Sequence, residues 1–267
     1  MKGIGVNILK LIDTHCHLSM PQFKGQVEAI IDEAKAVGVE RFVSVAFDEA
    51  SSEEVVSLTD RYKEQGVYAS IGVHPHDSKG VAGGIPESLK GLAEKDRVVA
   101  IGETGLDYHY DHSPRGVQRE VFALHINWAK EAKKPLIVHV REAYRDALGL
   151  LKSEEADEVG GVIHCFSGEK NDAFAAIDMG FYVSFAGPLT YPNNLSLKEI
   201  AALLPVERLL CETDSPYLAP QAHRGKTNKP AYVRYVYEAL SEAKGIGLDE
   251  LAQRLWDNAK ALFRWEG

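Results

Sequence analysis

Leu11-Ile-Asp-Thr-His-Cys-His17 is a short, mostly apolar run that ends in two histidines separated by one residue. Successive side chains of an extended strand point to opposite faces, so His15 and His17 share a face. Two neutral imidazoles on one face can hold a divalent metal, because ring nitrogens are among the commonest ligands of zinc and related ions. A lone His-x-His pair is more often a solvated or backbone-bonded strand end, so the rest of the chain decides between these two interpretations.

Short apolar runs of the same kind recur along the chain. They begin at residues 41, 67, 98, 135, 161, 182 and 209. Helices fit the segments between them, as in residues 26–38, where apolar residues follow the three-and-four spacing of an amphipathic helix. The other helices are expected over residues 51–66, 86–96, 118–134, 144–155, 172–180 and 197–204. This alternation predicts parallel strands joined by right-handed crossovers.

Eight such units predict an α/β fold of the (β/α)8 TIM barrel type, which typically has roughly 250 residues. No segment of the 267 residues is rich enough in Pro, Gly or Ser to be a linker. We therefore expect a single domain over residues 1–267, with residues 1–10 as an N-terminal extension and residues 248–265 as an extra C-terminal helix on the barrel exterior. An open doubly wound sheet is the alternative, but it normally has a glycine-rich phosphate turn where this chain has His-Cys-His.

The composition, with 45% hydrophobic and 26% charged residues, is ordinary for a soluble globular protein. No apolar run approaches the length of about 20 residues that spans a bilayer, and residues 1–10 lack the apolar core of a signal peptide. These features predict a cytoplasmic protein and indicate neither a membrane nor an obligate protein partner. The net charge of −9 gives no global attraction to nucleic acid, so any phosphate site must be local.

The chain has three cysteines, an odd number that argues against a disulfide framework and for reduced thiols. Cys16 and Cys165 each adjoin a histidine that is a candidate ligand, so strand alternation should point both thiols away from the site. Cys211 has the opposite parity to Asp214 and is interpreted in the same way. All three are expected to pack against helices.

Titratable residues gather where the predicted strands end. In a barrel of this type the active site lies at the C-terminal ends of the strands. Each of these residues taken singly could cap a helix or bond to the main chain. Together in one pocket they would repel one another or lose solvation unless a cation compensated. The candidates are His15, His17, Glu103, His139, His164 and Asp214.

Six ligating groups are too many for one tetrahedral ion, which suggests two divalent metals about 3.5 to 4 Å apart. Glu103 is the natural bridge between them. One ion would take His15, His17 and Asp214 across the seam that closes the barrel, and the other would take His139 and His164. Such a pair lowers the pKa of a bridging water and supplies hydroxide as the nucleophile, while Asp214 orients that water and takes its proton. Imidazole ligands suit Zn, whereas phosphate chemistry often uses Mg or Mn, and the mixture here allows either.

Seven motifs stand in order along the chain: Asp-Thr-His-Cys-His17, Gly-Val-His-Pro-His76, Gly-Glu-Thr-Gly-Leu-Asp-Tyr108, Val-His-Val-Arg-Glu-Ala143, His-Cys-Phe-Ser-Gly168, Glu-Thr-Asp-Ser-Pro-Tyr217 and Arg-Gly-Lys226 with Asn228 and Pro230. Their order, from Leu11 to about Phe263, resembles the TatD family of metal-dependent deoxyribonucleases, within the amidohydrolase-like barrels. The resemblance implies a hydrolase that cleaves phosphodiester bonds at DNA ends, often from the 3′ side, with a divalent metal pair held by the six ligands. Thr104 and the loop from Gly187 to Tyr191 depart from the usual pattern.

Candidate substrate contacts lie near the same strand ends. His74 and His76 follow the third strand, and Arg141 follows His139 by two residues and should face the same way. A basic cluster after the eighth strand contains Arg224 and Lys226, with His223 and Lys229. His74, Arg141 and Arg224 are expected to engage the phosphate of single-stranded DNA ends. Aromatic side chains could stack on a terminal base, although plain loop packing explains them equally well: Tyr108, Phe166, Tyr191 and Tyr217.

Three functions remain open at this point. The first is a metal-dependent phosphodiesterase acting on DNA, indicated by the six ligands and the basic loop. The second keeps every ligand but changes the bond, as in a metal-dependent amidohydrolase or esterase such as an aminoacyl-tRNA deacylase. The third is a non-catalytic protein that binds nucleic acid or metal, for which a complete ligand set with a base at Asp214 would be unnecessary.

Overall fold

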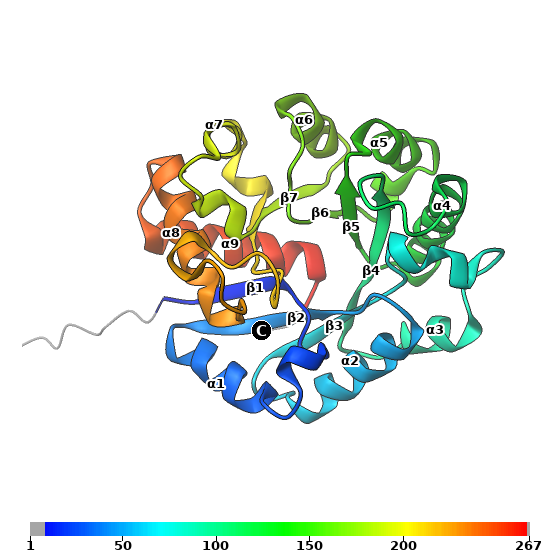
Figure 1. The fold of residues 1–267 in the computed structure, drawn as a ribbon, viewed down its shortest axis with the longest axis horizontal. Helices are drawn as coiled ribbons and strands as arrows, with labels where there is room; N and C mark the ends of the chain where they lie inside the picture. Colours follow the sequence, from blue (N-terminus) through cyan, green and yellow to red (C-terminus); the bar gives the residue numbers. More distant parts are fainter. Residues whose placement is uncertain (1–8, 266–267) are drawn as a thin grey trace, which may run out of the picture.

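A computed structural model describes residues 9–265 of the chain. Its strands form one eight-stranded parallel sheet in sequence order, with helices around it, which confirms the (β/α)8 TIM barrel (Figure 1). The strands are β1 (Leu11–Cys16), β2 (Val39–Val45), β3 (Val67–Ile71), β4 (Val98–Asp107), β5 (Leu136–Arg141), β6 (Gly161–Ile163), β7 (Tyr182–Phe185) and β8 (Leu209–Cys211). The α-helices are α1 (Val27–Ala36), α2 (Glu49–Arg61), α3 (Glu87–Leu92), α4 (Arg115–Ala132), α5 (Tyr144–Ser153), α6 (Lys170–Asp178), α7 (Leu195–Leu203), α8 (Val233–Lys244) and α9 (Leu248–Phe263).

The barrel closes between β8 and β1, just beyond the last residue of β8. The amide of His17 donates to the carbonyl of Ser215 at 2.8 Å, and the amide of Asp214 donates to the carbonyl of His15 at 2.9 Å. Beneath these bonds, the buried Asp13 carboxylate accepts the Thr213 hydroxyl at 2.6 Å. The seam therefore fixes the backbone of His15, His17 and Asp214 in one place.

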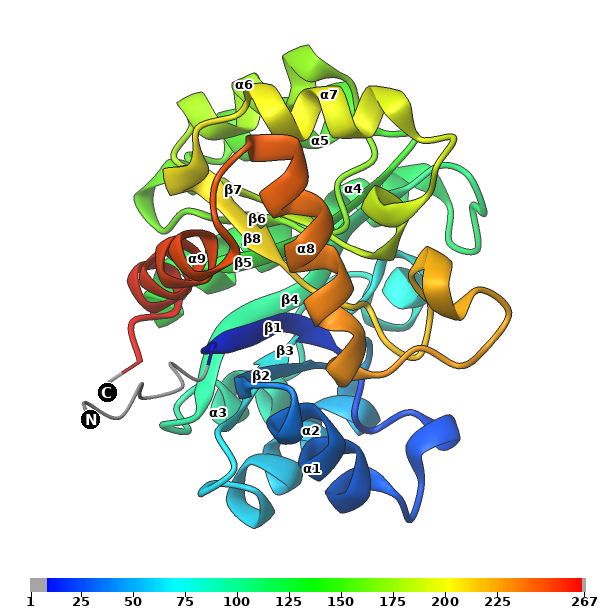
Figure 2. The same cartoon turned by 90° about the vertical axis from the view of Figure 1, so that its left-hand side faces the viewer.

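Two hydrophobic clusters fill the molecule. The larger one lies between the sheet and the surrounding helices. The smaller one occupies the barrel interior, since every strand contributes to it, from Ile12 of β1 to Leu210 of β8. Phe263 and Trp265 join this inner cluster. The prediction that α9 packs on the barrel exterior was therefore wrong at its C-terminal end, which covers the open end of the inner core beside the start of β1 (Figure 2).

The boundaries of several elements differ from the sequence-based expectation. Helix α3 is six residues long, shorter than the predicted 86–96, and α4 begins at Arg115 instead of residue 118. The larger difference is β4, expected to end at residue 101 but extending to Asp107, where it pairs with Arg141. Its register shifts between Ile101 and Thr104, so pairing resumes after an irregular segment that contains Glu103. Apolar periodicity does not reveal such an irregularity.

Glycines make this irregular segment possible. A Cβ on Gly72, which follows β3, would lie 2.8 Å from the Cα of Gly102 in β4. Real side chains do not approach a backbone so closely, so β3 and β4 can come together here only because Gly72 lacks a side chain, and a Cβ on Gly102 would instead meet the Ile137 carbonyl of β5. The Glu103 amide then reaches past β3 and donates to the carbonyl of Ala46 at 3.1 Å.

Most of the predicted N-terminal extension, residues 1–10, lies outside the described residues. Within residues 9–265, no helix has both the length and the apolar character that crossing a membrane requires.

Candidate metal centre

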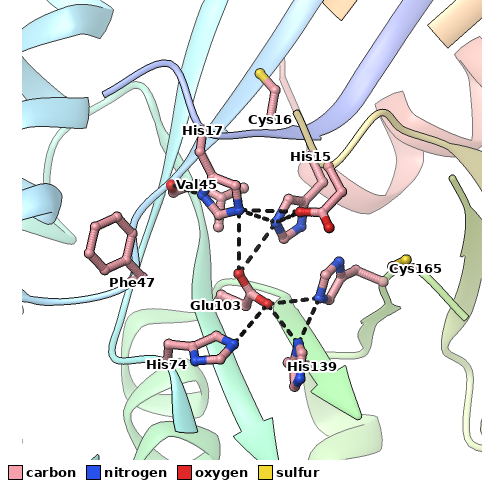
Figure 3. Close-up of polar contacts among 12 residues, drawn as sticks. His15, Cys16, His17, Val45, Phe47, His74, Glu103, His139 and Cys165 are labelled. Carbon is pink, nitrogen blue, oxygen red and sulfur yellow. Dashed lines mark hydrogen bonds and ion pairs between the residues drawn. The ribbon is translucent and has the colours of Figure 1, made fainter. Parts of the chain in front are cut away.

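Glu103 lies at the middle of a group of histidines at the C-terminal ends of the strands (Figure 3). Its Oε2 atom lies 3.4 Å from His15 Nε2 and 3.7 Å from His17 Nε2. Its Oε1 atom lies 2.8 Å from His164 Nε2 and 2.9 Å from His139 Nδ1. The two oxygens of one buried carboxylate thus face two different pairs of histidines.

The first ligand set consists of His15, His17 and Asp214. The Nε2 atoms of the two histidines are 3.2 Å apart. Asp214 Oδ1 lies 3.3 Å from the His17 nitrogen and 3.7 Å from that of His15. Ligands about 2.0 to 2.1 Å from a tetrahedral ion lie about 3.4 Å from one another, so these separations fit a single ion.

The second ligand set consists of His139 and His164 with the other oxygen of Glu103. The inward nitrogens of the two rings, Nδ1 of His139 and Nε2 of His164, are 3.2 Å apart. The His164 ring also stacks on the His15 ring with centroids 4.0 Å apart, so the two sets are contiguous. All six predicted ligands therefore converge on one small volume.

Each ligand histidine has an inner ring nitrogen that faces the other ligands and an outer one that faces away from them. The hydrogen-bond partner of the outer nitrogen determines whether the inner nitrogen carries a proton or a lone pair. His17 Nδ1 lies 2.8 Å from the Val45 carbonyl, His164 Nδ1 lies 3.1 Å from Glu212 Oε1, and His139 Nε2 lies 3.2 Å from Asp107 Oδ2. Each partner oxygen accepts, so each outer nitrogen donates and carries the proton of the neutral ring. In this neutral form of the rings, the inner nitrogens present lone pairs to one another and face two carboxylates. Such a set of buried acceptors fits a divalent cation.

His74 differs from these ligands, although it also faces Glu103. The backbone amide of His76 donates to His74 Nδ1 at 3.1 Å, so the neutral ring carries its proton on Nε2. This Nε2 lies 3.4 Å from Glu103 Oε1. Burial lowers the pKa of His74 to about 4, which keeps the ring neutral near pH 7. His74 is therefore placed to donate a hydrogen bond to Glu103 or to a substrate oxygen.

Both carboxylates of the centre are ionised. Burial by itself would raise the pKa of Glu103, but the surrounding histidines, His164 foremost, hold that pKa well below its usual range. Burial opposes ionisation of Asp214 as well, and the bond to His17 lowers its pKa. Burial opposes protonation of His17 and His164, but the neighbouring carboxylates raise the pKa of both rings, so protons balance part of this negative charge in the metal-free centre and a divalent cation would take their place.

A cleft with two lobes opens above the centre. His139, Arg141 and Asp214 line both lobes. The larger lobe, about 450 Å³, also has Phe47, Tyr110, Tyr217 and His76 on its walls. The Arg141 guanidinium lies 5.3 Å from the centroid of the Tyr110 ring. Arg141 is the only lysine or arginine among the described residues that line these two lobes.

The basic loop after β8 lies elsewhere. Arg224 stacks over the Tyr191 ring at 4.2 Å, and Lys229 pairs with Glu33 at 2.8 Å. Neither Arg224 nor Lys226 is among the described residues that line the cleft. The structure therefore brings Arg141, His74 and His76 to the cleft, but not Arg224 and Lys226, the other two predicted substrate contacts.

Of the four aromatic residues predicted to contact a base, two line the cleft and two do not. Tyr217 is 46% exposed on the larger lobe, and Phe166 lines the smaller one although its side chain is nearly buried. The Tyr108 hydroxyl instead donates to Asp146 at 2.8 Å, and Tyr191 lies under Arg224. Tyr110, which the sequence analysis did not select, is 53% exposed beside Arg141.

The prediction for the cysteines holds for two of the three. Cys16 and Cys211 are buried, and the Cys16 thiol points to the Val43 carbonyl at 3.5 Å, away from the histidines. The prediction for Cys165 was wrong, because this residue lines the smaller lobe of the cleft. Strand β6 ends at Ile163 and Cys165 has a φ of 42°, so strand alternation no longer applies there.

Sequence reasoning also missed the two carboxylates that hold the outer nitrogens, Asp107 and Glu212. Both stand in the quoted motifs, Gly-Leu-Asp and Glu-Thr-Asp, at the ends of β4 and β8. A second carboxylate two to four residues from a candidate ligand was the available signal. It did not specify which ring each carboxylate would face.

The barrel, together with a centre of four histidines and two carboxylates at the C-terminal strand ends, defines the class of metal-dependent barrel hydrolases. Residues 12–264 match the family model described as TatD related DNase. The chain belongs to the TatD family.

Known relatives agree with this assignment. YabD of Bacillus subtilis, described as an uncharacterized metal-dependent hydrolase, is 43% identical over 254 residues, which cover 95% of this chain and 99% of the relative. The 3'-5' ssDNA/RNA exonuclease TatD of Pantoea ananatis is 30% identical, with 95% and 99% covered. The crystal structure of YJJV, a TatD homologue of Escherichia coli, aligns with a TM-score of 0.89 at 29% identity over 97% of this chain and 100% of that one. The chain is thus a metal-dependent hydrolase.

Proposed function

We propose that this metal-dependent hydrolase is a deoxyribonuclease that removes nucleotides from the 3′ ends of single-stranded DNA, with two divalent ions as cofactors. The observation that carries the proposal is the shared carboxylate of Glu103 between two sets of inward lone pairs, beneath a cleft with one arginine. The ssDNA/RNA exonuclease named in Pantoea ananatis supports the choice of substrate.

Under this proposal, His15, His17 and Asp214 would hold one ion and His139 and His164 would hold the other, and Glu103 faces both sets with its two oxygens. When bound, Zn, Mg or Mn ions acidify the attacking water and stabilise charge on the phosphate oxygens. The protein itself supplies a base, because Asp214 faces both histidines with one oxygen and also borders the cleft. Its other oxygen takes the proton from the attacking water.

The remaining cleft residues bind and orient the substrate. Arg141 pairs with the scissile or flanking phosphate, since a guanidinium matches phosphate geometry and no other cation borders the described cleft. The neutral His74 donates from Nε2 and keeps Glu103 in place. Tyr217, half-exposed on the larger lobe, is placed to stack on an unpaired base, which favours single strands over duplex, whereas the Tyr110 ring already stacks with His112 and lies under Arg141.

The test is nucleotide release from end-labelled oligonucleotides. Protein stripped with a chelator is reloaded with Zn, Mg or Mn and incubated with single strands labelled at the 5′ or 3′ end. Release of mononucleotides from the 3′ end with at least one metal, and slower release from duplex, is expected. Absence of release with every metal would contradict the proposal.

A substrate panel separates this proposal from the amidohydrolase and esterase alternative. Phosphodiesters, carboxylic esters, aminoacyl-tRNA and amides are offered to the wild-type protein and to Arg141→Gln. Loss of the guanidinium should slow the two nucleic-acid substrates, DNA and aminoacyl-tRNA, but not neutral esters and amides, which have no charge for it to pair with. Faster turnover of an ester or amide than of DNA, unaffected by Arg141→Gln, would favour the alternative.

A further inference from the structure

The histidines of the two ligand sets differ in the hydrogen-bond partners of their outer ring nitrogens. Behind the second set stand two carboxylates: Asp107 at His139 and Glu212 at His164. Behind the first set, His17 bonds to the main-chain carbonyl of Val45 at 2.8 Å. Within residues 9–265, the buried Nδ1 of His15 has no hydrogen-bond partner. Among the described residues, therefore, carboxylates bond to the outer nitrogens of His139 and His164 but not to those of His15 and His17.

Asp107 is held firmly in this position. Its Oδ1 accepts the backbone amides of His109 at 3.0 Å and Tyr110 at 2.9 Å. Its own amide donates to Gln118 of α4 at 2.8 Å. Oδ2 is left for imidazole nitrogens, His139 at 3.2 Å and His76 of the cleft wall at 2.9 Å. The carboxylate thus has a fixed direction before any ion binds.

Glu212 is fixed in a similar way. Its Oε1 accepts the backbone amide of Cys165 at 2.7 Å, in addition to the His164 ring. Its Oε2 is buried and, among the described residues, has no hydrogen-bond partner. A buried carboxylate oxygen of this kind is stabilised by a positive charge nearby. A cation bound to His164 through Nε2 would supply that charge.

A carboxylate that accepts the outer N–H of a ligand histidine fixes the ring orientation and makes the inner nitrogen more basic. A main-chain carbonyl orients the ring but carries no charge. We propose that Asp107 and Glu212 are positioning residues that control the affinity of the ion held by His139 and His164 and leave the ion held by His15, His17 and Asp214 unaffected. This inference rests on the proposed metal pair and adds how each ion is controlled.

The experiment measures metal binding, not activity. Metal-free full-length protein is titrated with Zn²⁺ or Mn²⁺ in competition with a chromophoric chelator, which yields the number of sites and a dissociation constant for each. Asp107→Asn and Glu212→Gln should each weaken one of the two sites by about 10- to 100-fold and leave the other within about twofold. Two independent variants keep the test valid if one of them fails to fold.

Double variants assign the affected site. His17→Gln removes a ligand of the first set, so it should weaken the site that Asp107→Asn leaves intact. Asp107→Asn combined with His17→Gln should then weaken both sites, whereas Asp107→Asn combined with Glu212→Gln should still weaken only one. Asp146→Asn is the matched control, because it makes the same change of charge on α5 where Asp146 bonds to Tyr108. It should alter neither site.

Two results would overturn the inference, and both differ from failure of the proposed nuclease. Equal weakening of both sites, or of neither, in Asp107→Asn and Glu212→Gln would refute selective control while leaving a metal pair in place. A single site in the wild-type protein would refute the metal pair and this inference together. Two sites with selective control but without release of nucleotides would sustain this inference and contradict the nuclease.

Discussion

The two ends of the barrel interior are filled by opposite kinds of side chain. At the N-terminal end, Phe263 and Trp265 stack with ring centroids 5.0 Å apart and join an apolar cluster to which all eight strands contribute. At the C-terminal end, four imidazoles and two carboxylates direct lone pairs at one another. The apolar end lowers the free energy of the folded chain, whereas the polar end needs a cation to do so. Substitutions at the two ends should therefore affect different measurements.

Asp214→Asn should produce the largest effect at the polar end. Loss of the proton acceptor is expected to lower kcat by about 10²- to 10⁴-fold. The amide oxygen can still face His17, so the metal content of the purified protein should persist. Steady-state kinetics paired with elemental analysis checks both statements. Unchanged turnover would show that Asp214 is not the base. Loss of metal together with loss of turnover would show that Asp214 acts only as a metal ligand.

Phe263→Ala should produce the largest effect at the apolar end. Truncation of a buried phenylalanine costs about 3 to 5 kcal/mol of unfolding free energy, because a cavity replaces its contacts. Urea unfolding of the metal-free protein measures this loss. The number and affinity of metal sites in the folded variant should equal those of the wild type. A change in metal affinity would show that the two ends are coupled and that the division drawn here is wrong.

Outside the barrel interior, His125 of the surrounding helix α4 makes stability depend on pH without any metal. The Val73 amide donates to its Nε2 at 3.0 Å, and its Nδ1 donates to the Val121 carbonyl at 2.8 Å. Burial lowers the pKa of His125 to about 4, from 6.5 in the unfolded chain. The unfolded chain therefore binds the proton more readily, and stability is lost as pH falls from 6.5 towards 4. One such group accounts for up to about 3 kcal/mol.

His125→Gln tests this pH dependence. The amide can replace both hydrogen bonds but cannot be protonated in this range, so unfolding free energy should fall less steeply between pH 6.5 and 4 than in the wild type. Denaturant unfolding of metal-free protein at several pH values provides the comparison. An identical pH profile in both proteins would show that protonation of His125 does not contribute to the acid sensitivity.

The sequence predicts the six candidate metal ligands well, but it does not predict the carboxylates that bond to the outer nitrogens of the ligand histidines. Each candidate ligand stands at the end of an apolar run, and a barrel brings all such ends together whatever the details of packing. The partners behind the ligands depend on ring rotation and on distances across the barrel. Asp107 meets His139 only because β4 continues through an irregular segment, and Glu212, which follows β8, meets His164, which follows β6, across the intervening strand β7. Neither follows from periodicity.

Loop side chains mark the other limit of sequence reasoning. Arg224 was expected at the phosphate because it lies in the basic loop after β8. In the structure its guanidinium lies over Tyr191, a residue of the loop after β7. The path of a loop depends on contacts with other loops, which a single sequence does not specify. Arg141 was placed correctly on the cleft because it follows His139 on a regular strand.

Arg141 and Arg224 allow the comparison with the smallest expected effect. The same substitution can be made at an arginine that lines the cleft and at one that does not. Arg141→Gln should raise KM for single-stranded DNA by about 10-fold, the value of one charge-assisted bond to phosphate, with a smaller change in kcat. Because one phosphate contact is lost, the dependence of binding on log salt concentration should fall by about one unit of slope. Arg224→Gln should change neither quantity. If instead Arg224→Gln weakened binding as much as Arg141→Gln, the DNA would have to extend over the loop after β8, and the cleft alone would not account for the binding of the strand.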